Sequence, residues 1–192
     1  MEAAVEKGDA KKVAELIRQD PGFKVNMAVD AYGYTLLHEA CRGDSRSAVI
    51  PLLLAHPDID VNFKDKYGFT PFNYACLRGY TSCVREMLKD SRVKVNEPDN
   101  DGYTPLWCAA LYGHLDVIGW WIVSEREIDL GKLRDVDKTD AVGVAKKHGE
   151  IEVAALLERF QRDATQTRSE VRMELGLLSM VPGFVLVLIY LW

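Results

Sequence analysis

The stretch Gly102-Tyr103-Thr104-Pro105-Leu106-Trp107-Cys108-Ala109 decides the fold, because related segments occur three more times in the chain. They are Gly33-Tyr34-Thr35-Leu36-Leu37-His38-Glu39-Ala40, Gly68-Phe69-Thr70-Pro71-Phe72-Asn73-Tyr74-Ala75 and Lys138-Thr139-Asp140-Ala141-Val142-Gly143-Val144-Ala145. The closing alanines are separated by 35, 34 and 36 residues, and a glycine follows each segment at Gly43, Gly79, Gly113 and Gly149. Self-similarity at one period predicts a repeat protein whose units pack on their neighbours.

Each repeat predicts a pair of helices. A threonine stands where it can cap the first helix, and proline follows it in two repeats, at a position where a missing N–H costs little. The following glycine is expected to end that helix in the left-handed conformation. In the first full repeat, Ile50-Pro51 is expected to bend or delay the second helix. An apolar stripe marks the second helix of the third repeat: Val117, Ile118, Trp121 and Ile122.

These segments resemble the ankyrin repeat, whose signature is a Thr-Pro-Leu-His-x-Ala helix start with a period of about 33 residues. The resemblance covers about Glu2 to Phe160 and implies an all-α ankyrin-repeat solenoid of helix-turn-helix repeats with hairpin-like tips, followed by a C-terminal helix and apolar tail. Only His38 keeps the motif histidine, so the hydrogen bond that this residue makes between repeats is in question at Asn73, Trp107 and Gly143.

The expected domain organisation has two parts. Residues 1–162 form the repeat domain, with an N-terminal partial repeat at 1–29 and further repeats at about 30–64, 65–98, 99–134 and 135–162. The partial repeat is expected to serve as a cap or to reflect a truncated gene model. Residues 163–192 form the C-terminal helix and hydrophobic tail.

Composition limits the classes of partner and compartment. The 192 residues include 24 Lys and Arg and 29 Asp and Glu, which gives a formal net charge of −5. An acidic chain without a basic cluster argues against nucleic acid as a partner. The N-terminus has no apolar signal segment, and the four cysteines lack C-x-x-C spacing, so free buried thiols and a cytoplasmic, intracellular location are expected.

Candidate chemistry is sparse. His38 and Cys41 have a spacing that two metal ligands could use, but no second ligand pair is near in sequence, which favours a core histidine. Nucleophile, phosphate-loop and zinc-protease motifs are absent from the sequence. We therefore expect no enzyme activity, no cofactor and no metal. Trp107, Trp120 and Trp121 are expected to be buried, with a ligand pocket as the weaker alternative.

The resemblance implies that a protein partner binds at the turn tips and on the exposed face of the first helices. Aromatic and arginine side chains are typical of binding hot spots. The candidate residues are Tyr32, Tyr34, Arg42, Tyr67, Phe69, Leu77, Arg78, Tyr103, Leu111 and Tyr112. The alternative is that Tyr34, Phe69 and Tyr103 only pack tip against tip. The expected function is a monomeric, non-enzymatic protein-binding scaffold in which Arg42 and Arg78 meet carboxylates of an unidentified partner; regulation of a bound enzyme is an alternative.

The C-terminal segment carries a different pattern. Thr167-Arg168-Ser169-Glu170 matches the capping box and predicts a helix over about 168–181 that covers the exposed edge of the last repeat. Pro182 and Gly183 then interrupt it, and Phe184–Trp192 is a run of nine apolar residues. A membrane span needs about 20 residues. A tail that tethers the chain to the cytosolic face of a membrane, a segment packed on the solenoid, and an aberrant end of the gene product all remain open.

Overall fold

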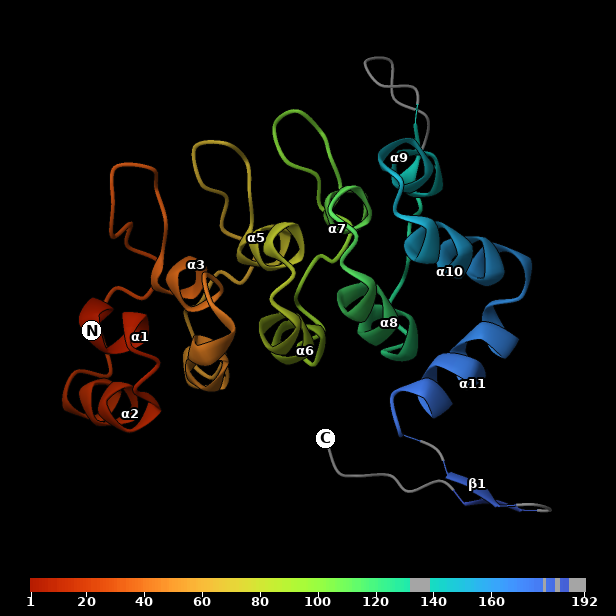
Figure 1. Ribbon diagram of the computed structural model, residues 1–192. Coiled ribbons are helices and arrows are strands. Elements are labelled where there is room, and N and C mark those ends of the chain that lie inside the picture. Colours follow the sequence, from red (N-terminus) through yellow and green to blue (C-terminus); the bar gives the residue numbers. More distant parts are fainter. Residues whose placement is uncertain (132–138, 178, 182–183, 187–192) are drawn as a thin grey trace.

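The computed structural model describes residues 1–131, 139–177, 179–181 and 184–186. Within these ranges the helices follow one another as pairs along a solenoid (Figure 1). The pairs are α1 (Glu2–Glu6) with α2 (Ala10–Gln19), α3 (Leu36–Ala40) with the 3-10 helix η1 (Asp44–Val49) and α4 (Ile50–Leu54), α5 (Pro71–Arg78) with α6 (Thr81–Leu88), α7 (Pro105–Leu111) with α8 (Leu115–Val123), and α9 (Ala141–His148) with α10 (Ile151–Arg162). The predicted all-α repeat fold is confirmed.

Two rows of helices enclose the core. The first helices of the pairs, α1, α3, α5, α7 and α9, each contact the next along one row. The second helices form the other row, and the long connections between pairs project together as tips on the side of the first row (Figure 1). The core between the rows is continuous from end to end; its largest fully buried side chains include Leu37, Ile50, Phe72, Met87 and Trp121.

The first helices begin at the residues that the sequence predicted. The Thr70 hydroxyl accepts a hydrogen bond from Asn73 N at 3.1 Å, and the Thr104 hydroxyl accepts one from Trp107 N at 3.3 Å. Asp140 takes the same position in α9 and accepts from Gly143 N at 2.7 Å. These caps satisfy N–H groups that the first turn of a helix leaves without partners.

The prediction for the glycines is confirmed in the later repeats and wrong in the first. Gly79 and Gly113 have φ of 71° and 69°, whereas Gly43 has φ of −177° and is extended. The first full repeat is one residue shorter here, so α3 ends at the Cys41 cap and Gly43 instead precedes η1. The second helix then begins as a 3-10 turn and becomes α-helical at Ile50-Pro51, which confirms the predicted delay.

The tryptophans are less uniformly buried than predicted. Trp121 is fully buried and packs edge-on against Phe72, with ring centroids 5.1 Å apart. Trp107 and Trp120 are only half-buried. Trp107 is turned toward the tip, where it stacks on Tyr103, and Trp120 lies beneath the guanidinium of Arg85 at 3.9 Å. Both rings therefore cover the surface of the third repeat.

The C-terminal helix is displaced from its predicted range. Helix α11 (Ala164–Glu174) begins after Asp163, whose side chain accepts from Gln166 N at 2.9 Å, and it ends before Gly176, which has φ of 70°. The predicted end at 181 is wrong, because Ser179–Val181 forms strand β1 and pairs antiparallel with β2 (Phe184–Leu186). Helix α11 packs against α8 and α10, as a cover for the end of the solenoid.

The apolar-tail prediction for Phe184–Trp192 gains no support. Its first three residues form β2, and residues 187–192, like the predicted break at Pro182 and Gly183, lie outside the described residues. In the described part of the chain, none of the helices combines the length and the apolar character needed to cross a membrane.

Candidate partner-binding surface

A buried histidine near the start of α3 ties the first full repeat to the next one. His38 Nε2 lies 3.0 Å from the carbonyl oxygen of Phe69, and its Nδ1 accepts from Thr35 N at 3.2 Å. Desolvation lowers the pKa of the His38 imidazole, which favours the neutral ring that these two contacts require. Both ring nitrogens are therefore engaged within the fold.

The residues that replace this histidine behave differently from one another. Asn73 Nδ2 donates to the carbonyl oxygen of Glu97 at 3.0 Å, so a hydrogen bond between repeats persists with a shorter side chain and another carbonyl. Trp107 Nε1 is buried without a hydrogen-bond partner in the part of the chain that the structure describes. The sequence left these positions open, and only Asn73 preserves the interaction.

Three aspartates that were not among the predicted residues shape the tips. Asp65 Oδ1 accepts from Tyr67 N and from Phe69 N, both at 2.8 Å, and Asp30 and Asp99 occupy the same place in their own tips. Their regular spacing, three residues before each tip glycine, was the signal that would have found them. Because the aspartates fix the tip backbones, the exposed side chains are presented in defined directions.

Neighbouring tips are also joined by backbone hydrogen bonds. Lys66 N donates to the carbonyl oxygen of Tyr32, and Asn100 N donates to that of Tyr67, both at 3.0 Å. The tips therefore form a continuous ledge along the first row of helices.

The predicted aromatic residues meet on this ledge. The rings of Tyr32 and Tyr67 stack with centroids 6.2 Å apart, yet their exposed fractions are 53% and 55%. Tyr34 lies 6.1 Å from Tyr32 and meets Tyr74 edge-on at 5.9 Å. Tyr34 is half-buried, and burial raises the pKa of its phenol. Tyr74, which the sequence analysis missed, thus links the tips to the helices.

The two predicted arginines flank the same tyrosines. The Arg42 guanidinium lies 5.2 Å from the Tyr34 ring centroid and pairs with Glu39 at 2.9 Å. The Arg78 guanidinium lies 5.6 Å from the Tyr74 ring centroid, and its side chain is exposed. These contacts define a continuous patch, called the aromatic–arginine surface below, that consists of Tyr32, Tyr34, Arg42, Tyr67, Tyr74 and Arg78.

The remaining predicted residues lie in more covered or more distant positions. Phe69, Leu77, Tyr103 and Leu111 are half-buried. Tyr103 stacks on Trp107 at 4.2 Å, and Tyr112, with an exposed fraction of 56%, stacks near His114 at 6.1 Å. Tyr103 and Tyr112 therefore form separate ring contacts in the third repeat.

The cysteine thiols are poor candidates for nucleophiles or metal ligands. All four cysteines are buried and free. Burial raises the pKa of Cys41 and Cys76 well above the ordinary value and that of Cys83 and Cys108 to about 12. A protonated thiol is a weak nucleophile and metal ligand. Across the described residues, no group of three or more His, Cys, Asp or Glu is arranged to hold a metal ion.

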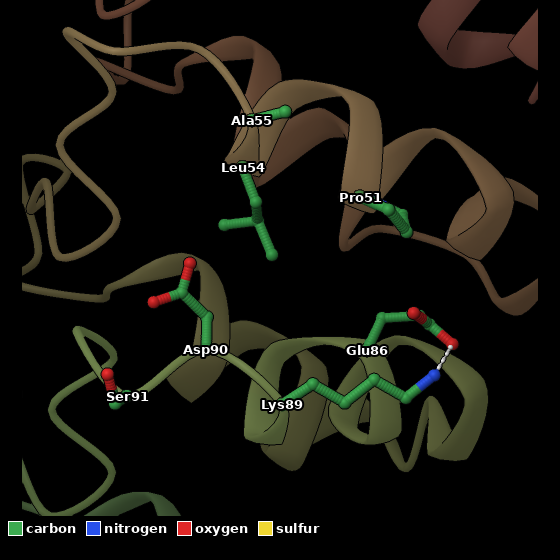
Figure 2. Close-up of a pocket in the computed structure, with 7 residues that line it drawn as sticks. All are labelled: Pro51, Leu54, Ala55, Glu86, Lys89, Asp90 and Ser91. Carbon is green, nitrogen blue, oxygen red and sulfur yellow. Dashed lines mark hydrogen bonds and ion pairs between the residues drawn. The ribbon is translucent and has the colours of Figure 1, made fainter. Parts of the chain in front are cut away.

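A shallow hollow lies between the ends of α4 and α6 (Figure 2). It encloses about 410 Å³ between Pro51, Leu54 and Ala55 on one side and Glu86 and the Lys89–Ser91 turn on the other. Lys89 pairs with Glu86 at 2.9 Å, and Asp90 pairs with Arg92 at 2.6 Å. With these charges neutralised by neighbours, the hollow presents no acid–base pair.

Comparison with known proteins agrees with the geometry of the repeats. Residues 45–132 match the family model for ankyrin repeats in three copies. Residues 45–132 are therefore ankyrin repeats. Ankyrin repeats indicate a protein–protein interaction module.

Three relatives share part of their sequence with this chain. The chain is 41% identical over 85 residues to SMC5-SMC6 complex localization factor protein 1 of Homo sapiens, and 35% identical over 113 residues to alpha-latrotoxin-Lg1a of Latrodectus geometricus. These matches cover 44% and 58% of the chain but only 8% of each relative. An ankyrin repeat protein of Rickettsia bellii is 33% identical over 99 residues, which cover 52% of the chain and 54% of that protein.

Proposed function

We propose that this chain is a monomeric protein-binding module that holds its partner on the aromatic–arginine surface. The observation that carries the proposal is the stacked pair Tyr32 and Tyr67, which stays more than half exposed on a ledge joined by backbone hydrogen bonds. Large, rigid, exposed aromatic rings contribute contact area at little entropic cost, as binding hot spots do.

The charges of the surface favour a partner segment that carries carboxylates. Arg42 already shares its charge with Glu39, whereas Arg78 has no ion pair with any described residue and rests on the Tyr74 ring. A guanidinium held over an aromatic ring keeps its N–H groups available for a bidentate carboxylate. We infer that Arg78 contacts an acidic side chain while Tyr32 and Tyr67 pack against apolar atoms beside it.

A capture experiment tests the proposal. Full-length wild type, the triple variant Tyr32→Ala/Tyr67→Ala/Arg78→Glu and the control Arg18→Glu are used to enrich proteins from a cell extract, followed by quantitative mass spectrometry. Arg18 lies exposed at the end of α2, so its variant matches the charge change away from the surface. We expect at least one protein that falls about tenfold with the triple variant and is retained by the control, since one or two hot-spot residues each contribute 1 kcal/mol or more.

The relatives give further support for a role in protein–protein contacts. One relative is named SMC5-SMC6 complex localization factor protein 1, and it is 41% identical to this chain over 85 residues. If every protein captured by the wild type is also retained by the triple variant, while all variants unfold at the same temperature, the aromatic–arginine surface is not the binding site.

We also propose a reducing compartment such as the cytoplasm as the place of action. The support is that all four cysteines are free and buried. Alkylation of the chain denatured directly from cells, without added reductant, is expected to label all four thiols, and protection of any of them would contradict the proposal.

A further inference from the structure

A second hollow lies on the outer row of helices, away from the tips, where α8, α10 and α11 meet. It encloses about 460 Å³. Its floor is apolar and consists of Leu115, Gly119, Ala155, Leu156, Val171 and Leu175. Figure 1 places these three helices at the end of the solenoid, on the side opposite the projecting tips. We call this hollow the α11 groove.

Helix α11 is fixed as a wall of the groove by its contacts with α8. Arg168 Nε donates to the carbonyl oxygen of Ile122 at 3.1 Å, and Arg172 donates to that of Val123 at 3.4 Å and pairs with Glu125 at 2.6 Å. These arginines supply donors to the last carbonyls of α8, where positive charge is favoured. The groove is therefore preformed.

Helices α8 and α11 meet at Gly119 and Val171. Val171 is 3% exposed, and a Cβ added at Gly119 would lie 3.6 Å from its Cγ1. Since Gly119 also lines the groove, the same glycine deepens the floor.

The rim of the groove is acidic. Asp116, Glu152 and Glu174 line it together with a single cation, Arg159. Arg159 is itself paired, with Glu170 at 3.3 Å and with Glu174 at 3.8 Å. The carboxylates of Asp116 and Glu152 are therefore left to face an approaching ligand.

An exposed apolar residue extends the floor beyond the groove. Ile151 has an exposed fraction of 77% and begins α10, one helical turn before Ala155. Residues four apart share a face of a helix, so Ile151 lies on the same face of α10 as Ala155 and extends the apolar floor along it. An apolar strip with an acidic rim is complementary to a segment with one apolar face and basic flanks.

We propose that the α11 groove binds a basic amphipathic helix of a protein partner, whose apolar side chains fill the floor and whose lysines or arginines pair with Asp116 and Glu152. In this binding mode, the apolar face of the partner helix packs into the groove. It is independent of the aromatic–arginine surface, and it gives the chain two separate docking sites. The acidic rim disfavours two other occupants. The chain's own C-terminal run is uncharged, and a second copy of the chain is itself acidic.

A peptide probe tests the charge and the place of binding. The probe is a labelled amphipathic peptide of about 14 residues made of leucine and lysine, and its matched control carries glutamate for lysine. Fluorescence anisotropy with the full chain is expected to show binding of the lysine peptide only. The variant Glu152→Lys/Ala155→Arg should weaken this binding at least about tenfold, whereas the control Glu2→Lys/Ala3→Arg, at exposed positions of α1, should leave it unchanged. Equal binding by the two peptides, or equal loss in both variants, would overturn the proposal.

Crosslinking identifies the occupant directly. Ala155→p-benzoylphenylalanine in the full chain places a photoreactive ring at an exposed position on the floor. Irradiation with the lysine peptide present is expected to give a peptide adduct. Adducts exclusively with residues 184–192 of the same chain, or with a second copy, would show that the groove is closed by the protein itself and would refute the proposal.

Discussion

The rings of Tyr32 and Tyr67 stack across two neighbouring tips with an interplanar angle of 27° and a centroid separation of 6.2 Å. The backbones beneath them are joined as well, because Lys66 N donates to the carbonyl oxygen of Tyr32. The same two residues thus couple adjacent repeats and remain exposed to a partner. Their contributions to stability and to binding are separable by experiment.

The stack is expected to contribute little to stability. In a double-mutant cycle of Tyr32→Ala, Tyr67→Ala and the double variant, urea unfolding should give a coupling energy of about 0.5–1 kcal/mol, the range for exposed aromatic pairs. Each single variant should unfold within about 1 kcal/mol of wild type. A loss several times larger would mean that these tyrosines are packing residues and would remove the main support for a binding role.

Alanine is expected to destabilise the chain at Gly79 but not at Gly43, although the two glycines occupy matching positions in their repeats. Gly79 has φ of 71°, and a Cβ there would lie 2.5 Å from Nδ1 of His114, so Gly79→Ala should cost about 2 kcal/mol or more. Gly43 is extended, and the nearest atom to a Cβ there is Arg46 Nε at 3.6 Å. Gly43→Ala should change the free energy of unfolding by less than about 0.5 kcal/mol. Thermal unfolding of both variants checks the contrast, and equal losses would contradict it.

The sequence predicted the features that depend on local chemistry. Thr70 and Thr104 cap their helices as expected, because a hydroxyl before a proline acts on the adjacent turn. Gly43 was mispredicted because one missing residue moved the helix end, and the glycine, although still present, lost the position that requires positive φ. The backbone conformation of this glycine therefore depends on its position relative to the helix end more than on its residue type.

The start of the C-terminal helix and the role of Tyr74 could not be predicted from the local sequence alone. Asp163 and Thr167 both suit a helix cap, and Asp163 is the one used, because α11 must place Arg168 and Arg172 at the end of α8. Likewise the tip tyrosines were found from their spacing, but Tyr74 was missed because its role depends on Tyr34 and Arg78 reaching it from other segments. Tertiary packing decides both cases.

Asn73 is expected to be a structural substitute for the motif histidine. It is fully buried, donates to Glu97 O at 3.0 Å and accepts from the Thr70 hydroxyl. Asn73→Ala should cost about 2–3 kcal/mol in urea unfolding, because the Thr70 hydroxyl and the Glu97 carbonyl oxygen each lose a hydrogen bond. Asn73→His should stay within about 1 kcal/mol of wild type, since His38 makes the equivalent contacts with Thr35 and Phe69. Similar losses in both variants would show that the site demands asparagine itself.

Protonation of His38 is expected to make stability fall in mild acid. Desolvation keeps the folded-state pKa of this fully buried imidazole below its ordinary value near 6.5, to which it returns on unfolding. The unfolded chain therefore binds more protons below pH 6.5. The contribution of His38 to the free energy of unfolding is complete above that pH, and it is lost as the pH falls toward the folded pKa, at up to about 1.4 kcal/mol per pH unit.

Urea unfolding of wild type and His38→Asn from pH 7.5 to pH 5 isolates this contribution, because the other ionisable groups are common to both chains. Asparagine is the residue that the next repeat places at the corresponding position, Asn73. The difference in the free energy of unfolding between the two chains should shrink as the pH is lowered, since only wild type loses stability through protonation at residue 38. A difference that stays constant over this range would mean that the folded His38 accepts a proton as readily as the unfolded one, and that its contacts with Thr35 and Phe69 do not require the neutral ring.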